Sequence, residues 1–216
     1  GLVNDGIRMR MHGPEVVDKI YTYNQGTVLG ASLEIALALR DDVGLGNTDP
    51  IDSFDHSHRA DASVFYITHI RELVKAIALH LATPQGVILC PPHETRDGDG
   101  ALFKGILARY LADVALRLPE DSRENIATRK VAARMVMASA ESLWNHRLEV
   151  DGLPIFASEW SDDARLPHNY GLGPSSISEA VGLVRIDERD LSVQLSGWML
   201  LEAAARIAGG EPEDSE

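Results

Sequence analysis

A cluster of polar and aromatic side chains runs directly into an apolar segment over residues 21–31. Thr22, followed three residues later by Gln25, has the form of a capping box, which predicts a helix with Thr22 as its N-cap. Tyr23 and Asn24 would then lie at the mouth of that helix, where free backbone N–H groups and the positive end of the macrodipole favour the oxygens of a polar ligand. The spacing leaves a second interpretation open, in which Gln25 only closes the cap and the tyrosines only pack.

Lys104 is a candidate functional cation. It would lie in the first turn of a helix predicted over residues 101–118. A cation at that position opposes the helix macrodipole by a few tenths to about 1 kcal/mol. Because a local rule is broken there, a functional reason for the lysine gains weight, although the residue pattern alone still favours the alternative. The alternative is a snorkelling lysine, whose stem packs on apolar surface while its head reaches water.

Two pairs of adjacent aspartates could serve carboxylate chemistry, which needs positioned and partly desolvated acids. Asp41 and Asp42 follow a predicted helix C-terminus, where the macrodipole disfavours acids, so we interpret them as part of a solvated loop. Asp162 and Asp163 lie in a segment rich in Gly, Pro and Ser, and we interpret them as a solvated turn. Neither pair is assigned a catalytic role.

The segment over residues 41–60 also holds acids and histidines at a metal-like spacing, namely Asp52, Asp55, His56 and His58. A His-x-His unit can direct two imidazoles at one ion, but the spacing fixes no third or fourth ligand. We therefore favour a solvated acidic loop, and the sequence predicts neither a metal nor any other cofactor.

Three motifs follow one another along the chain: Asn4-Asp5-Gly6, Tyr23-Asn24-Gln25-Gly26, and Phe103-Lys104-Gly105-Ile106 with Arg109-Tyr110-Leu111. In that order they resemble the second half of glycoside hydrolase family 76, the endo-acting α-1,6-mannanases and related transglycosidases. The resemblance touches segments from about residue 2 to about residue 207, and its second and third motifs are the specific ones.

This resemblance implies an α/α toroid of paired helices of the six-hairpin type, with a sugar-binding groove across its mouth. It also implies retaining hydrolysis of α-1,6-linked mannan by an adjacent aspartate pair, about 5 Å apart, in the half of the family domain that precedes this one. The residues that would bind and orient the sugar are Asp5, Tyr23, Asn24, Gln25 and Lys104, with Trp160 as the candidate for stacking. The family also implies a secreted or cell-envelope protein, although the chain shows no signal peptide.

The rest of the pattern predicts an all-α chain, because apolar residues recur at helical spacing over residues 23–40, 61–82, 101–118, 123–146 and 191–208. The first and third of these helices are apolar nearly all round and need neighbours on every side, whereas the second and fourth are amphipathic and suit outer positions. This alternation predicts an open arc, with residues 1–210 as one portion of a domain and 211–216 as a disordered acidic tail. Self-association is expected if apolar helix edges lack cover.

Composition limits the classes of partner. Acids outnumber bases 33 to 20, giving a formal charge of -13, which argues against nucleic acid because phosphates need a basic face. No apolar run approaches the roughly 20 residues of a membrane span. Cys90 is the single cysteine, so no disulfide can form within the chain. A polysaccharide or oligosaccharide is the partner that fits best.

Two other classes of protein stay open at this stage. A sugar epimerase on a related α/α toroid would need histidines at the groove, and a non-catalytic helical carbohydrate-binding or scaffold protein would need no polar residues at helix mouths. Long structured loops are often functional, and the segment over residues 152–189 carries the aromatic residues Phe156, Trp160 and Tyr170. These rings either stack on sugar faces or anchor the loop.

Overall fold

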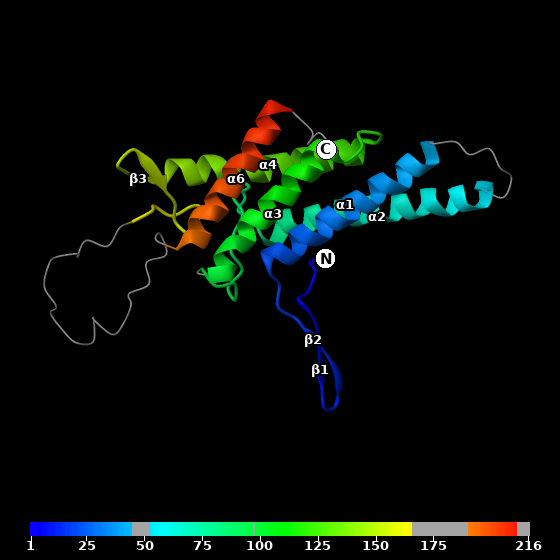
Figure 1. Cartoon of the computed structure of the whole chain (residues 1–216), viewed down its shortest axis with the longest axis horizontal. Coiled ribbons are helices and arrows are strands. Elements are labelled where there is room, and N and C mark those ends of the chain that lie inside the picture. The colour runs from blue at the N-terminus through cyan, green and yellow to red at the C-terminus, as the bar shows by residue number, and fades with distance from the viewer. Residues whose placement is uncertain (45–51, 97, 166–189, 211–216) are drawn as a thin grey trace, which may run out of the picture.

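Helices dominate the part of the chain that the structure describes, residues 1–44, 52–96, 98–165 and 190–210 (Figure 1). The structure is a computed structural model, and for residues 41–44, 52–57 and 59 only the backbone is described. The elements in chain order are β1 (Gly6–Arg10), β2 (Gly13–Val17), α1 (Thr22–Gly44), α2 (Asp52–His80), α3 (Gly98–Arg117), α4 (Arg123–Asn145), β3 (Leu148–Val150), β4 (Leu153–Ile155) and α6 (Leu191–Gly209).

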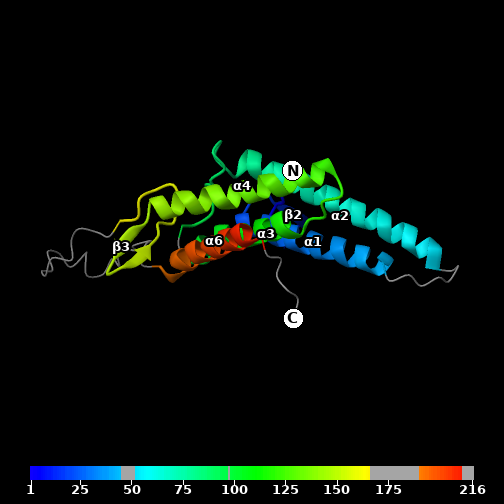
Figure 2. The same ribbon diagram turned by 90° about the horizontal axis from the view of Figure 1, so that it is seen from above.

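The helices form two layers, which are seen edge-on in Figure 2. One layer holds α1, α3 and α6, with α3 between its two neighbours, and the other holds α2 and α4. Each of the pairs α1–α2 and α3–α4 crosses from the first layer to the second, and α2 contacts α4. This is the alternation of inner and outer helices that the sequence predicts, and it confirms the all-α fold of the α/α toroid type, of which the chain forms an open arc.

Helix α3 is the centre of the packing, because it contacts α1, α4 and α6. Two glycines let its neighbours approach closely. A Cβ on Gly30 of α1 would lie 2.3 Å from the Tyr110 ring, and one on Gly105 of α3 would lie 2.9 Å from Cα of Ser196 on α6. Any larger residue at either position would force two helices apart, and side chains such as Leu107 and Leu111 are completely buried between them.

The prediction that the first helix is buried on all sides is wrong for this chain. Leu29 and Leu33 are completely buried, but Ile35 is 40% exposed and the face that carries Thr27 and Ala31 is exposed as well. Helix α1 therefore has neighbours on one side only, because it lies at one end of the arc. The same pattern at residues 101–118 is interpreted correctly, since α3 lies inside the arc.

The predicted solvated loop over residues 41–60 is shorter than expected. Helix α1 continues to Gly44, so Asp41 and Asp42 belong to its last turn, and α2 begins at Asp52. No Gly or Pro interrupts the sequence from Asp52 to Ala60, which allows the helix to begin this early. The side chains of Asp52, Asp55 and His56 lie outside the described part of the chain, so the interpretation of their spacing stays a prediction. Among the side chains that are described, no group of three or more His, Cys, Asp or Glu could hold a metal ion.

The lead-in to α1 is a β-hairpin that projects from the helices (Figure 1). Strands β1 and β2 pair antiparallel, and the ladder continues at the base through the Asp5 N–H, which donates to the Lys19 carbonyl at 2.8 Å. Side chains alternate between the two faces of the hairpin, and Ile7, Met9 and Val16 share one face. These three residues are 61 to 75% exposed. The self-association expected from uncovered helix edges stays a prediction.

Nearby residues cap the ends of α4 and α6. The Ser122 hydroxyl accepts from the N–H of Asn125 and caps α4, and Gly210 ends α6 with a φ of 69°. Asp190 serves two helices, because one carboxylate oxygen accepts from the Ser192 N–H of α6 and the other from the Gly98 N–H of α3. No helix of the described segments is long and apolar enough to cross a membrane. The predicted tail and Tyr170 lie outside the described residues.

Candidate functional site

The predicted capping box does not form, because both of its side chains bond elsewhere. The Gln25 carbonyl oxygen accepts from the Val3 N–H at 2.8 Å, and its amide donates to the carbonyls of Val3 and Tyr21 at 2.9 Å each. Gln25 is completely buried. It therefore fastens the segment before β1 to the start of α1, and it lies behind the helix mouth instead of at its surface.

Glu94 occupies the N-terminus of α1 in place of the predicted cap. One of its carboxylate oxygens accepts from the Thr22 N–H at 2.8 Å, and both accept from the Thr22 hydroxyl, at 2.8 and 3.0 Å. Glu94 is 5% exposed, and burial raises the pKa of its carboxyl group while the bonds from Thr22 oppose the rise. Sequence analysis missed this residue, because Glu94 and Thr22 are 72 positions apart and no local pattern links them.

Three of the predicted binding residues do meet at the helix mouth. One Asp5 carboxylate oxygen accepts from the Asn24 amide at 3.1 Å and from the Tyr23 hydroxyl at 3.3 Å. Asp5 as a whole is exposed to solvent. Burial and the neighbouring Asp5 carboxylate raise the pKa of Tyr23, so its hydroxyl keeps its proton. The cluster of Asp5, Tyr23 and Asn24 thus offers a charged acceptor held in place by two donors.

Aromatic rings surround this cluster. The Phe103 ring lies 4.4 Å from the Tyr23 ring and 5.7 Å from the Tyr21 ring, and His93 lies 5.3 Å from Tyr21, each measured between centroids. Together they line a pocket of about 510 Å³, which we call the mouth pocket; its residues are Asp5, Tyr21, Tyr23, His93, Thr95, Gly98, Asp99, Gly100 and Phe103. Phe103 belongs to the same sequence motif as Lys104, and it is Phe103, not Lys104, that lines this pocket.

Lys104 points away from the mouth pocket into the protein. It lies in the second turn of α3, because that helix begins at Gly98, and it is 3% exposed. Its ammonium group donates to the Ser158 carbonyl at 2.7 Å and lies 3.5 Å from a Glu159 carboxylate oxygen. Burial lowers the pKa of Lys104, and the Glu159 carboxylate opposes this change. The snorkelling interpretation is therefore wrong, since the head of the side chain is the part that is held.

Trp160 is also part of the interior. It is 1% exposed, and the Lys104 ammonium lies 4.7 Å from the centroid of its ring. A ring this deeply buried presents no face to a sugar, so Trp160 anchors the segment after β4 in the way that the alternative interpretation expects. Phe156, which is completely buried, does the same. Phe103 and Tyr23 take the place of Trp160 as the candidate stacking surface.

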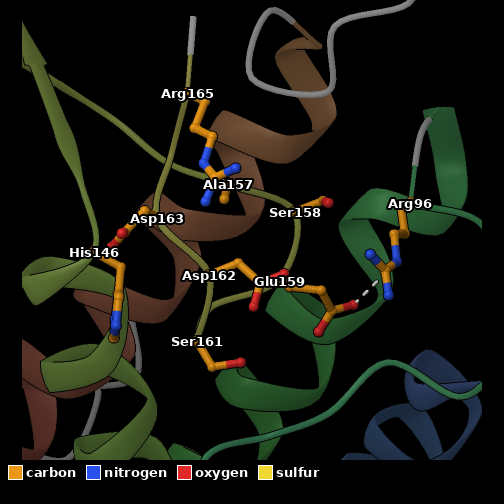
Figure 3. Close-up of a pocket in the computed structure, with 9 residues that line it drawn as sticks. All are labelled: Arg96, His146, Ala157, Ser158, Glu159, Ser161, Asp162, Asp163 and Arg165. Atoms are coloured by element: carbon orange, nitrogen blue, oxygen red, sulfur yellow. Dashed lines mark ion pairs between the residues drawn. The ribbon is translucent and has the colours of Figure 1, made fainter.

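A second pocket, which we call the charged pocket, lies where the segment after β4 meets the segment before α3 (Figure 3). Its volume is about 460 Å³, and its lining residues are Arg96, His146, Ala157, Ser158, Glu159, Ser161, Asp162, Asp163 and Arg165. Arg96 and Arg165 lie on opposite sides, with Glu159 and Asp162 between them. The predicted turn at Asp162 and Asp163 is present, exposed to solvent, and it forms one wall of this pocket.

Aromatic rings, a carboxylate and an amide thus lie together at the mouth of α1. No protein-family model matches the chain, and no curated protein matches it. A solved structure that is similar to it is an α-1,6-mannanase, GH76A of Salegentibacter sp. HEL1_6, as an inactive variant with two consecutive aspartates changed to asparagine, in complex with α-1,6-mannotriose.

The similarity to this mannanase extends over 95% of the chain at 27% identity, with a TM-score of 0.60. It covers 46% of the mannanase, so the chain spans about half the length of that enzyme. The chain therefore has the fold of a partial domain like those of glycoside hydrolase family 76, as the three sequence motifs indicate.

Proposed function

We propose that this chain forms the sugar-binding part of an α-1,6-mannanase-like glycoside hydrolase, with the mouth pocket as the place where a mannose unit binds. The observation that carries the proposal is the Asp5 carboxylate, held by Tyr23 and Asn24 beside the Phe103 ring, at a helix mouth. The similar mannanase, whose structure contains α-1,6-mannotriose, supports the choice of ligand.

The chemistry of the pocket suits a neutral sugar. A carboxylate accepts hydrogen bonds from hydroxyl groups, and bonds to a charged acceptor are worth about 1.5 to 3 kcal/mol each. Phe103 and Tyr23 supply an apolar surface for the C–H face of the ring. Gln25 and Glu94 act through the backbone, because they fix the start of α1 and thereby the positions of Tyr23 and Asn24.

The hydrolytic step needs two carboxyl groups about 5 Å apart in a retaining enzyme. We assign that role to aspartates outside this chain, as the family resemblance implies. Asp162 and Asp163 are exposed at a turn, whereas a catalytic acid needs a partly desolvated position that shifts its pKa towards the working pH. The purified chain is therefore expected to bind mannan fragments without cleaving them.

Calorimetric titration of the chain with α-1,6-mannotriose tests the proposal, with an α-1,4-linked glucose trisaccharide as the control ligand. We expect saturable binding of the mannotriose and at least tenfold weaker binding of the control. Equal or absent binding of both sugars would refute the proposal. Release of mannose by the chain alone, lost on changing Asp162 and Asp163 to Asn, would move the catalytic pair into this chain.

One observation favours the epimerase alternative, namely that His93 lines the mouth pocket. Its Nε2 atom lies 2.9 Å from the Ile20 nitrogen and 2.5 Å from the Ile20 carbonyl oxygen, so in either tautomer the backbone occupies that nitrogen. This contact favours a structural role for His93. We therefore retain the hydrolase proposal.

A further inference from the structure

We propose that the charged pocket is a second saccharide subsite, which binds a neighbouring sugar unit through Arg96 and Glu159 by hydrogen bonds to hydroxyls instead of by stacking. The inference rests on the proposed function, because it extends the ligand from the mouth pocket. It assigns a role to residues that no sequence motif singled out.

The first reason is a pair of groups with unused hydrogen-bonding capacity. Glu159 is 8% exposed, and its Oε1 atom is buried with no hydrogen bond to any described residue. The Arg96 Nε atom lies 3.5 Å from that oxygen, which is an ion pair too long for a good hydrogen bond. Within the described segments, Arg96 makes no hydrogen bond, and its side chain is 59% exposed. A buried acceptor without a partner costs about 1 to 3 kcal/mol, so a ligand hydroxyl that reaches it is favoured.

The second reason is that buried residues behind the pocket hold Glu159 in a fixed position. The second carboxylate oxygen of Glu159 faces the Lys104 ammonium, which is itself bonded to the Ser158 carbonyl. Lys104 also lies over the Trp160 ring, so the segment that carries Glu159 is fastened to α3 at three consecutive residues. A fixed acceptor binds a ligand group without the entropy cost of ordering a free side chain.

The charge balance of the pocket indicates a neutral ligand. Three cations and three carboxylates surround or support it: Arg96, Lys104 and Arg165 against Glu159, Asp162 and Asp163. A phosphate or an amine would be repelled by one of the two sets. A hydroxyl both donates and accepts, and therefore matches a surface where guanidinium and carboxylate groups alternate.

The two pockets are adjacent along the backbone. Thr95 lines the mouth pocket and Arg96 lines the charged pocket, and the Cα atoms of consecutive residues are about 3.8 Å apart. On α3, Phe103 lines the mouth pocket, and the next residue, Lys104, contacts Glu159 of the charged pocket from the protein interior. One oligosaccharide can therefore place one unit against the Phe103 ring and a second unit beside Arg96.

The test compares ligands of different length on the whole chain. Calorimetric titrations with methyl α-D-mannoside and α-1,6-mannotriose are made on the unchanged protein, on Arg96→Met and on Arg40→Met. Arg40 is a matched control, because it is a partly exposed arginine in a surface ion pair with Asp121 on another part of the arc. We expect Arg96→Met to weaken mannotriose binding about tenfold, which corresponds to the loss of one or two hydrogen bonds. The affinity for the monosaccharide should stay unchanged.

Each outcome has a definite meaning. If mannotriose binds the unchanged protein and Arg96→Met binds both ligands as well as the control does, the subsite is refuted and the proposed function survives. If neither ligand binds the unchanged protein, the proposed function fails and the subsite with it. Asp162→Asn is a second variant at an exposed position, and we expect it to weaken mannotriose binding severalfold; an equal loss for the monosaccharide in both variants would also refute a separate subsite.

Discussion

The mouth pocket and the charged pocket lie on either side of one short segment, yet they are built in opposite ways. The mouth pocket is lined by aromatic rings, and its carboxylate, Asp5, is held by two neutral donors. The charged pocket is lined by small and ionised side chains. Its carboxylate, Glu159, forms ion pairs with two cations, the buried Lys104 and the exposed Arg96.

If both pockets bind sugar as we propose, this difference gives two ways of recognising it. Stacking in the mouth pocket depends on the shape of one ring face and is tolerant of the positions of its hydroxyls. Ionised donors and acceptors in the charged pocket depend on where the hydroxyls lie. If both pockets bind one ligand, the mouth pocket supplies affinity for a single unit and the charged pocket makes affinity depend on chain length.

The largest effect is expected from Lys104→Met, which removes the buried cation under the charged pocket. Breaking a buried ion pair on one side costs about 3 kcal/mol or more, because Glu159 is left without its partner. In a protein of this size that lowers the melting temperature by roughly 6 to 12 °C. Differential scanning calorimetry measures the change, with Lys130→Met on the exposed face of α4 as the control. Equal melting of both variants would show that the ion pair does not support the pocket.

The corresponding support of the mouth pocket is Gln25, and Gln25→Glu is expected to cost about 2 kcal/mol. The substitution removes two N–H donors and points a carboxylate at the carbonyl oxygens of Val3 and Tyr21. A capping role alone would make the change nearly neutral, because glutamate serves a capping box equally well. Thermal unfolding of this variant beside Gln85→Glu, at an exposed position, distinguishes the two roles.

A sharper test of the comparison is Asp5→Asn, which changes the mouth pocket alone. We expect mannotriose and methyl α-D-mannoside to lose affinity alike, by about tenfold, because a charged acceptor becomes a neutral one. Asp18→Asn, in the same exposed lead-in, should leave both affinities unchanged. A loss confined to the trisaccharide would reverse the roles that we give to the two pockets.

The smallest effect concerns pH and Glu94. Its raised pKa means that the folded protein keeps a proton at a pH where the unfolded chain has released it. The contribution of Glu94 to stability is therefore fully present below the ordinary pKa of a glutamate and decreases as the pH rises through the raised value. Urea unfolding at several acidic pH values should show that Glu94→Gln removes this downward slope; parallel profiles of the two proteins would contradict it.

The sequence could predict what local patterns encode. Helix spacing identifies α3 as a central helix, and Ser122 and Gly210 have residue types that cap a helix through bonds to nearby residues. The motif around Tyr23 and Asn24 predicts a polar helix mouth, and these two residues do meet Asp5 there.

Contacts between distant residues could not be predicted in this way. Gln25 and Thr22 fit a capping box by spacing, but stronger partners at Val3 and Glu94 take them, and only the packed fold brings those partners close. The burial of Lys104 and Trp160 likewise depends on the segment after β4 folding back on α3. A single sequence contains no local signal for such a contact.

The bond between Glu94 and Thr22 also bears on the order in which the protein folds. Helix pairs such as α1–α2 are neighbours in sequence and close early at little entropic cost, whereas contacts of long sequence separation form late. Thr22 is joined to a residue 72 positions away and Lys104 to a carbonyl 54 positions away. The two pockets should therefore be the last regions to form during refolding, and amide hydrogens there should be the first to exchange when the native arc opens locally.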